Sequence, residues 1–197
     1  MNHHLFKDAA ACSPSSQRWR NSPVRLLTGI SRAIESVATQ EFIRAMRGAA
    51  TGVNVVTTDG PAGRFGLTVS AFASVSAEPP MVLVCINRRS PACAAIRDNQ
   101  GFCVNVLSTS QRPLAETFAG NPDIGEPYDF DTGTWTHRQT GSPVLCNSVA
   151  GFDCALASAM DAGSHTIFLG AVKAVEHSDV SPLLYTDRMY RRACCEA

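Results

Sequence analysis

Hydrophobic and polar residues alternate strictly along residues 66–76. One set of positions carries small apolar side chains, and the other carries small hydroxyl groups around a single aromatic residue, Phe72. An alternation with a period of two predicts a β-strand. An ordinary solvated face would carry Lys, Glu or Arg, whereas short hydroxyl side chains let a flat ligand approach the backbone and form hydrogen bonds. The segment therefore fits either a ligand-binding strand or an edge strand with a Ser/Thr face.

The remaining patterns predict several strands and a few short helices. β-branched or apolar runs between turn residues indicate strands, and the continuous apolar run at 81–86 indicates a strand buried on both faces. Thr39, Ser90 and Ser110 occupy positions typical of helix N-caps. The predicted strands are 53–58, 66–76, 81–86, 101–107, 150–157 and 165–175, and the predicted helices are 26–37, 39–47, 90–99 and 110–119.

The order of these elements favours one mainly β architecture. Six or seven strands and two or three short helices do not alternate, which favours a β-barrel with helical decoration over a doubly wound sheet. Residues 120–143 are rich in Pro and Gly. They are predicted to form a long loop, of a length usually associated with function or mobility.

Composition narrows the classes of protein. The 17 basic and 17 acidic residues cancel, so nothing indicates binding to nucleic acid or to an anionic membrane. There is no apolar run long enough to span a bilayer and no secretory signal, and we expect a cytoplasmic protein. Residues 1–39 are predicted to be a loosely ordered extension and 40–197 a single domain. The eight cysteines form no C-x-x-C pair, which favours reduced thiols.

Several catalytic motifs are missing from the sequence. Neither a dinucleotide-binding G-x-G-x-x-G before a helix, nor a P-loop, nor a G-x-S-x-G elbow occurs. The histidines show no ligand spacing, so we expect no metal. Arg88 and Arg89 precede Ser90 at a predicted helix start, where guanidinium groups and the helix dipole would favour a phosphate. These residues alone favour the other interpretation, a solvated arginine pair in a strand–helix loop.

Five motifs occur in order along the chain. They are ATGVNVVTT at 50–58, GLTVSAFASVS at 66–76 with Pro79 and Pro80, VNVL at 104–107, GSHTIFLG at 163–170, and PLLY at 182–185 followed by Tyr190. With these motifs the region from about residue 41 to 192 resembles the short-chain flavin reductases, the reductase halves of two-component flavin monooxygenases. It looks most like the reductases that serve 4-hydroxyphenylacetate, phenol and pyrimidine monooxygenases, and the segment TTDGPAGR at 57–64 is especially similar to the pyrimidine-pathway member.

The resemblance implies a split β-barrel that forms a homodimer and binds FMN or FAD near the subunit interface. It implies that His165 faces the nicotinamide of NADH or NADPH, with Tyr185 and Arg188 near the same dinucleotide. Ser164 stands where the family usually has Asp. Any role of that acidic side chain is therefore not expected in this chain. The flavin-binding residues that the resemblance implies are Thr68, Val69, Ser70, Ala71, Phe72, Ser74, Val75, Arg89, Ser90, Val104 and Asn105.

The implied activity is hydride transfer from nicotinamide C4 to flavin N5, after which reduced flavin leaves for an oxygenase partner. The cofactors carry this chemistry and the protein orients their rings. Two alternatives stay open. The flavin could remain bound and pass electrons to another acceptor, such as a corrinoid or a metal complex. The chain could also be a non-enzymatic flavin- or haem-binding protein.

Overall fold

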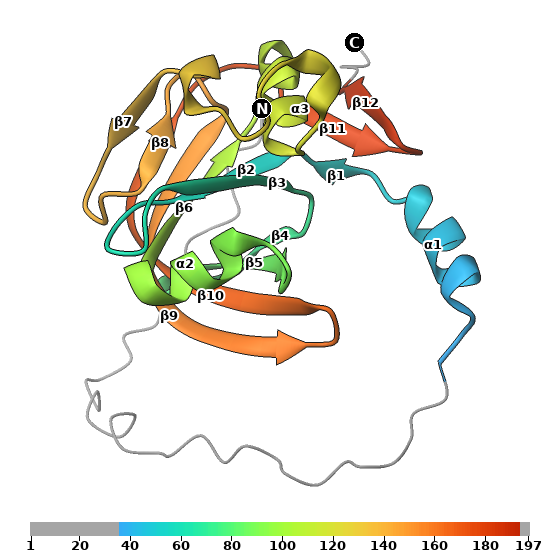
Figure 1. The fold of residues 1–197 in the computed structure, drawn as a ribbon, viewed down its shortest axis with the longest axis horizontal. Coiled ribbons are helices and arrows are strands. Elements are labelled where there is room, and N and C mark those ends of the chain that lie inside the picture. Colours follow the sequence, from blue (N-terminus) through green and yellow to red (C-terminus); the bar gives the residue numbers. More distant parts are fainter. Residues whose placement is uncertain (1–35, 194–197) are drawn as a thin grey trace, which may run out of the picture. The chain divides into compact units, whose positions relative to one another are not determined.

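The computed structural model describes residues 36–193, and from Ala38 onward they belong to one compact unit. Its main sheet has seven strands in the order β3-β2-β6-β9-β10-β5-β4, and every neighbouring pair is antiparallel (Figure 1). These strands are β2 (Asn54–Thr58), β3 (Phe65–Val69), β4 (Phe72–Ala77), β5 (Pro80–Asn87), β6 (Gly101–Val106), β9 (Ala150–Ala162) and β10 (His165–His177).

The segment predicted as one strand at 66–76 is in fact two strands at opposite edges of this sheet. β3 pairs with β2, β4 pairs with β5, and only Ser70 and Ala71 lie between β3 and β4. The amide of Phe72 donates to the carbonyl of Ser70 at 3.1 Å, which marks a tight turn. Because two residues connect the two edges, the sheet must curl into an open barrel.

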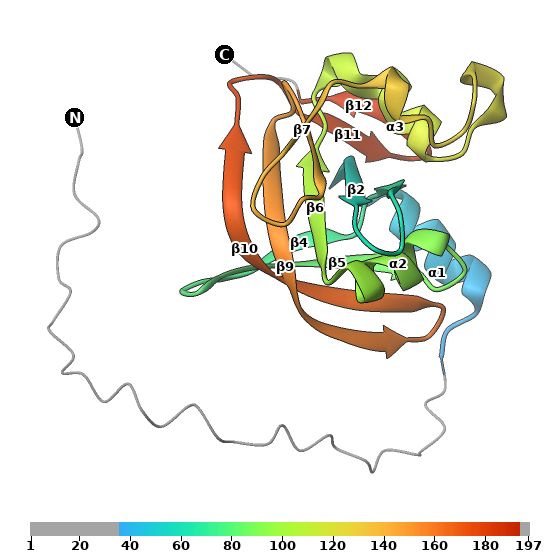
Figure 2. The same ribbon diagram turned by 60° about the vertical axis from the view of Figure 1, so that its left-hand side comes forward.

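Strands β9 and β10 supply the strongest bend of the sheet, as Figure 2 shows. Their pairing register shifts between Leu169 and Gly170 and again between Val172 and Ala174, and such bulges bend a strand. A Cβ atom at Gly170 would lie 2.6 Å from Cζ of Phe102. The glycine therefore lets the bent strand approach the core closely.

Two hydrophobic clusters fill the interior. The first includes Val84, Phe102 and Phe168 and packs around α2 (Pro91–Asn99). The second lies under α3 (Arg112–Phe118) and the C-terminal strands. The run at 81–86 is fully buried only at alternate positions, because Met81, Leu83 and Cys85 are partly exposed, so the prediction of burial on both faces is wrong. The fully or nearly buried positions are Val82, Val84 and Ile86.

Three of the predicted helices, at 39–47, 90–99 and 110–119, are present, and the first and third have N-caps other than those expected. Thr39 lies inside α1 (Thr39–Arg47), which follows Ala38. Ser108, and not Ser110, caps the short 3-10 helix η1 (Thr109–Gln111) before α3 through a capping box with Gln111. The predicted helix at 26–37 falls almost wholly outside the described residues.

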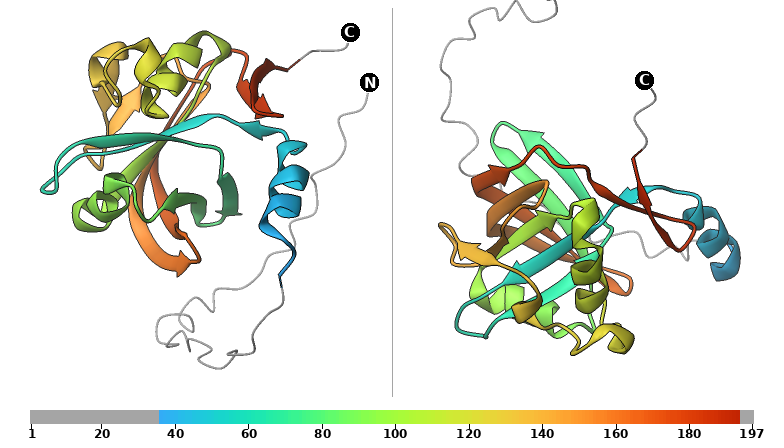
Figure 3. Two further views of the ribbon diagram at one scale, coloured as in Figure 1. Left: turned by 45° about the vertical axis from the view of Figure 1, so that its right-hand side comes forward. Right: turned by 90° about the horizontal axis from the view of Figure 1, so that it is seen from above.

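The described residues contain twelve strands, more than the six or seven expected. The predicted loop at 120–143 contains two 3-10 helices and most of a hairpin. β11 and β12 form a small sheet with β1, and this sheet lies beside α1 in Figure 3. The amide of Asp187, in the turn between β11 and β12, donates to the carbonyl of Arg47 at the end of α1 at 2.7 Å. These elements are η2 (Pro122–Ile124), η3 (Phe130–Thr132), β7 (Trp135–His137), β8 (Pro143–Leu145), β1 (Thr51–Gly52), β11 (Leu183–Thr186) and β12 (Met189–Arg192).

The five cysteines within the described part of the chain are free thiols. Burial, and then the neighbouring Asp153 carboxylate, raises the pKa of Cys154 to about 12, and the same causes in the same order raise the pKa of Cys103. Both thiols are therefore protonated near neutral pH. Over residues 36–193 no helix has the length and apolar character needed to cross a membrane.

Candidate functional site

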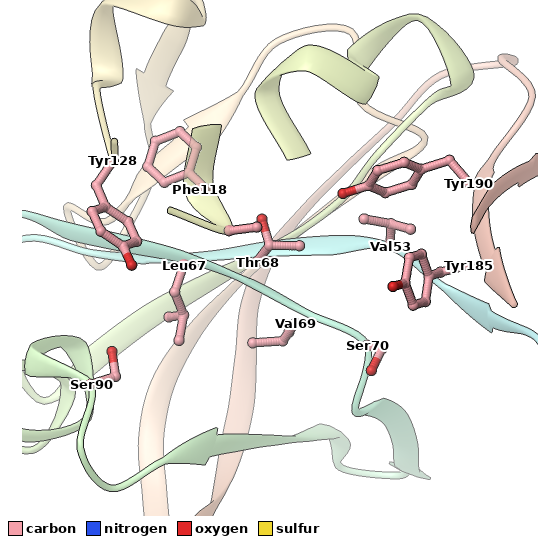
Figure 4. Close-up of a pocket in the computed structure, with 11 residues that line it drawn as sticks. Val53, Leu67, Thr68, Val69, Ser70, Ser90, Phe118, Tyr128, Tyr185 and Tyr190 are labelled. Carbon is pink, nitrogen blue, oxygen red and sulfur yellow. The ribbon is translucent and has the colours of Figure 1, made fainter. Parts of the chain in front are cut away.

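A cavity of about 370 Å³ extends along β3 (Figure 4). Ser90 and Tyr128 lie toward one end of it, and Ser70 and Tyr185 lie toward the other. Its volume is at the lower end of the range of about 300–1,000 Å³ for small-molecule pockets. We call it the first cavity, and it is lined by Val53, Leu67, Thr68, Val69, Ser70, Ser90, Phe118, Ala119, Tyr128, Tyr185 and Tyr190.

The Ser and Thr hydroxyl groups of this cavity differ in whether their proton is already used in a hydrogen bond within the protein. Thr68 Oγ1 donates its proton to the carbonyl of Ala115 at 2.7 Å, which ties β3 to α3. Thr68 can therefore only accept a hydrogen bond from a ligand. Ser70 is exposed, and the side chain of Ser90 makes no capping bond to α2. Both serine hydroxyls can therefore donate to a bound molecule.

Two tyrosines form the end of the cavity near β11 and β12. The rings of Tyr185 and Tyr190 meet edge to face with centroids 5.4 Å apart, and the guanidinium of Arg112 lies 5.3 Å from the Tyr190 centroid. Burial, followed by the charge of Glu116, raises the pKa of Tyr190. The phenol therefore stays protonated and offers a donor beside a flat aromatic surface.

A second cavity of about 650 Å³ adjoins the first. Ser90 and Tyr128 line both. The second cavity combines two arginines with three aromatic side chains and the start of α2. Its lining residues are Arg64, Phe65, Gly66, Asn87, Arg89, Ser90, Pro91, Ala92, Tyr128 and Phe130.

The two neighbouring arginines before α2 have different environments. Arg88 is 3.6 Å from the carboxylate of Asp161, whereas Arg89 lines the second cavity. The Arg89 amide donates to Oδ1 of Asn87 at 2.9 Å, which fixes the turn into Ser90. Pro91 then begins α2. Of the two candidates, Arg89 is thus the one beside the hydroxyl of Ser90, where an anionic group would meet both.

His165 is exposed and lines neither cavity. It begins β10 opposite Asn87, and its Nδ1 shares a hydrogen bond of 2.9 Å with Oγ of Ser164. Nearby, a hydrogen bond from Thr166 at 2.7 Å, and then the charges of Arg88 and Arg97, lower the pKa of Asp161. His165 is therefore on the strand next to the Arg89 turn, and its predicted contact with nicotinamide stays a prediction.

The structure brings together only part of the predicted set. Thr68, Val69, Ser70, Ser90 and Tyr185 line the first cavity and Arg89 lines the second. The other predicted binding residues line neither, and their roles stay predictions. Phe72 packs on Phe152, Val104 lies in the core, and the buried Asn105 side chain donates to Val55 O. Ala71, Ser74 and Val75 are exposed at the β4 edge. Arg188 lies in the turn between β11 and β12.

Several lining residues were not predicted. Three of them are aromatic, namely Phe118, Tyr128 and Phe130. The fourth, Arg64, follows a cluster of turn residues. Tyr128 has a positive φ of 63°, which is uncommon for a bulky residue and indicates a constrained position. A large aromatic residue inside a long Pro/Gly-rich loop was the available signal for Tyr128. Nothing in the sequence connects that loop with β3.

Together these features define a mainly β protein whose two adjoining cavities suit a flat aromatic ligand with an anionic end. Residues 46–193 match the model of the "Flavin reductase like domain" family, so the chain belongs to this family. The predicted membership and the predicted mainly β class of fold are therefore confirmed, whereas the predicted dimer stays a prediction.

Named relatives agree with this membership. The chain is 41% identical over 162 residues to "FMN reductase (NADH) RutF 1" of Methylorubrum extorquens strain PA1, covering 82% of this chain and 79% of the relative. The NADH:FAD oxidoreductase SgcE6 of Streptomyces globisporus C-1027 superposes with a TM-score of 0.72 at 31% identity, over 83% of this chain and 99% of that one. BorF, the flavin reductase component of a bacterial two-component tryptophan halogenase, gives a TM-score of 0.71 at 31% identity. This match covers 79% of this chain and 98% of BorF.

Proposed function

We propose that this protein is a flavin reductase that uses a reduced nicotinamide dinucleotide, with NADH as the first candidate. The observation that carries the proposal is the first cavity, which places donors and aromatic rings along β3 and opens onto Arg89 through Ser90. A bound flavin would accept a hydride at N5 from nicotinamide C4. The relative at 41% identity is named for FMN and NADH, which supports this pair.

The residues of the cavity fit a flavin. Val69 and Phe118 offer apolar surface for the rings, and the Ser70 hydroxyl can hydrogen-bond to polar ring or ribityl atoms. Arg89 and Ser90 would hold the phosphate, where a charge-assisted bond is added to the positive end of α2. The protein's task is to hold two flat rings in contact and to keep water from between them.

We also propose binding roles for the predicted residues that line neither cavity. We infer that His165 and Arg188 contact the dinucleotide together with Tyr185. Each of these groups can hydrogen-bond or pack, and no proton transfer is required of them. We propose supporting contacts to the flavin from Ala71, Phe72, Ser74 and Val75, and we propose that the buried Val104 and Asn105 back the ring from inside the sheet.

We also propose a homodimer that passes reduced flavin to an oxygenase in the cytoplasm. The α1 face with Phe42, Ile43 and Met46 is exposed within the described chain, which supports a second copy as its partner. The similarity to a component of a two-component halogenase supports a flavin-using partner enzyme. In this proposal residues 40–197 are the reductase domain and 1–39 an extension.

Steady-state oxidation of NADH, measured with and without added FMN, tests the proposed activity. We expect a rate that saturates with free FMN at micromolar concentrations, because flavin is a substrate that leaves. A rate independent of added flavin, but dependent on another acceptor, would contradict the release of flavin. Flavin binding without any oxidation of NADH or NADPH would contradict an enzymatic role.

A further inference from the structure

The end of the β9–β10 hairpin is held by few contacts. β6 pairs with β9 only as far as Ala155, and the amide of Leu156 then donates to the carbonyl of Gln100 at 2.9 Å. Over residues 158–162, β10 is the only strand of the described chain that pairs with β9. This part of the hairpin lies below α2 in Figure 1. Because His165 is at the same end, its position depends on what holds this free edge of the sheet.

One side chain attaches the free edge to the neighbouring helix. The guanidinium of Arg97, on α2, donates to Oδ1 of Asp161 at 2.6 Å. The guanidinium of Arg88, in the turn before α2, lies 3.6 Å from Oδ2 of the same carboxylate. Oγ1 of Thr166 on β10 also donates to Oδ1, at 2.7 Å. A single carboxylate therefore joins both strands of the hairpin to α2 and to the turn before it.

These ion pairs suit a local role better than a global one. The side chains of Asp161, Arg88 and Arg97 are 47%, 54% and 41% exposed, and exposed ion pairs contribute little to the stability of a whole fold. A segment with few other contacts opens locally at a lower free energy than the fold as a whole. We therefore expect the Asp161 contacts to fix the position of the hairpin end and to change global stability little.

The backbone of this hairpin end is joined to the turn that carries Arg89. His165 pairs with Asn87, and the amide of Arg88 donates to the carbonyl of Ser164 at 3.0 Å. Oδ1 of Asn87 in turn accepts from the amide of Arg89. A movement of the hairpin end would therefore move His165 relative to Arg89, the proposed phosphate contact.

We propose that Asp161 is a positioning residue for hydride transfer, which keeps His165 at the place where the nicotinamide binds. This inference rests on the proposed function. Asp161 contacts neither the flavin nor the nicotinamide in this proposal, and it acts through His165 by holding the hairpin end against α2. Ser164, beside the histidine, carries no charge and cannot form these ion pairs.

Steady-state rates of the full-length protein at varied NADH and saturating FMN test this proposal. Asp161→Asn keeps the size of the side chain and removes its charge. We expect the KM for NADH to rise about three- to tenfold, whereas kcat and the affinity for FMN each stay within about twofold. A fall in kcat with an unchanged KM would overturn the proposal.

Asp98→Asn is the matched control. Asp98 is exposed next to Arg97 on α2 and forms no ion pair within residues 36–193, so this variant removes one negative charge and keeps the attachment. We expect wild-type kinetics from it. An equal rise in KM in both variants would show that the effect follows net charge, and would overturn the role of Asp161.

A double-mutant cycle shows whether Asp161 acts through the histidine. In the His165→Ala background, Asp161→Asn should change kcat/KM for NADH by less than about twofold, because the group that it positions is already missing. Losses that multiply in the double variant would mean that Asp161 acts independently of His165, which contradicts the proposal.

Hydrogen exchange gives a readout that does not depend on activity. The amides of residues 158–166 should exchange faster in Asp161→Asn than in the wild type, and at the wild-type rate in Asp98→Asn. Unchanged exchange in Asp161→Asn would show that the carboxylate does not hold the hairpin end, and would overturn the proposal.

The outcomes also separate this inference from the proposed function. If the wild type oxidises NADH and Asp161→Asn has the same KM, the reductase stands and only the positioning role fails. If His165→Ala has wild-type kinetics, Asp161 has nothing to position and the inference is wrong. Absence of NADH oxidation by the wild type would instead contradict the proposed function.

Discussion

At the scale of single residues, the neighbours Arg88 and Arg89 have different environments and therefore different expected roles. Both residues lie in the turn between β5 and α2. Arg88 pairs there with Asp161, whereas Arg89 lines the second cavity. The residue pattern favoured neither arginine, and only the family resemblance selected Arg89, because the surroundings of the pair depend on β9, β10 and the turn between them.

Arg89→Ala is expected to weaken FMN binding by about 1.5–3 kcal/mol, the range for a lost hydrogen bond to a charged group. Riboflavin has no phosphate, so its binding should be almost unchanged. Calorimetric titration of both ligands measures the difference. Arg88→Ala is the control and should leave FMN affinity intact, and equal losses for FMN and riboflavin would remove Arg89 from the phosphate site.

His165→Ala should leave flavin affinity nearly unchanged, because the side chain lines neither cavity. If the ring positions nicotinamide, the KM for NADH rises and kcat/KM falls about 10–100-fold, or roughly 1.4–2.7 kcal/mol. Initial rates at varied NADH and saturating FMN provide the measurement. Wild-type kinetics in this variant would assign His165 a structural role.

At the scale of elements, local patterns located most strands and helices but not their ends or partners. The alternation at 66–76 continues unbroken through Ser70 and Ala71, and it contains no Gly or Pro at the turn. Nothing local signals that its halves lie at opposite edges of the sheet, because pairing with β2 and β5 decides this. The hairpin of β7 and β8 was missed for a related reason, since strands of three residues carry too little periodicity to detect.

Gly66 in β3 should not tolerate a side chain. A Cβ atom there would lie 2.5 Å from Cε1 of Phe118 and 3.1 Å from Cζ of Phe130. Gly66→Ala is expected to lower the free energy of unfolding by about 1–3 kcal/mol through overpacking. Urea unfolding measures the change. Gly52→Ala is the matched control, because no atom lies within 4 Å of its Cβ position, and an equal loss there would contradict the explanation.

The turn between β9 and β10 should make stability depend on acid pH. The hydrogen bond from Thr166, and then Arg88 and Arg97, lower the pKa of Asp161. A lowered carboxyl pKa stabilises the fold above the unfolded pKa of about 3.9, and this contribution is lost as the pH falls through the folded value. Thr166→Val removes the hydroxyl and lets the pKa of Asp161 rise.

The difference in unfolding free energy between wild type and Thr166→Val should therefore be larger at pH 7 than at pH 3. Urea unfolding at the two pH values tests this, and an NMR titration of the Asp161 carboxyl reports the pKa directly. A difference that is the same at both pH values would mean that the hydroxyl acts through packing alone.

At the scale of the whole molecule, the apolar face of α1 needs an explanation. Phe42, Ile43 and Met46 are 57%, 36% and 51% exposed, although their helical spacing is that of a buried stripe. The sequence pattern correctly located the helix and its apolar face. It could not show that the face meets nothing within the described chain, because burial depends on the arrangement of the other elements.

Replacing Phe42 and Met46 together by Ser should shift the protein from dimer to monomer, since two large apolar contacts are lost at a second copy. Light scattering after size exclusion reports the mass, and we expect twice the mass of one chain for the wild type. Arg44→Ala on the same helix is the control and should remain dimeric. A dimeric double variant would place the interface elsewhere, and a monomeric wild type would contradict the homodimer.

The two-residue connection between β3 and β4 has a consequence for how the chain reaches its native state. The β2–β3 and β4–β5 hairpins are both local in sequence, so each closes a short loop at small entropic cost. The connection holds these hairpins together before β6, β9 and β10 have arrived. Those three strands must pair with both hairpins at once, since β6 meets β2 and β10 meets β5. Lengthening the connection would relax this coupling, so its shortness favours folding in a single cooperative step.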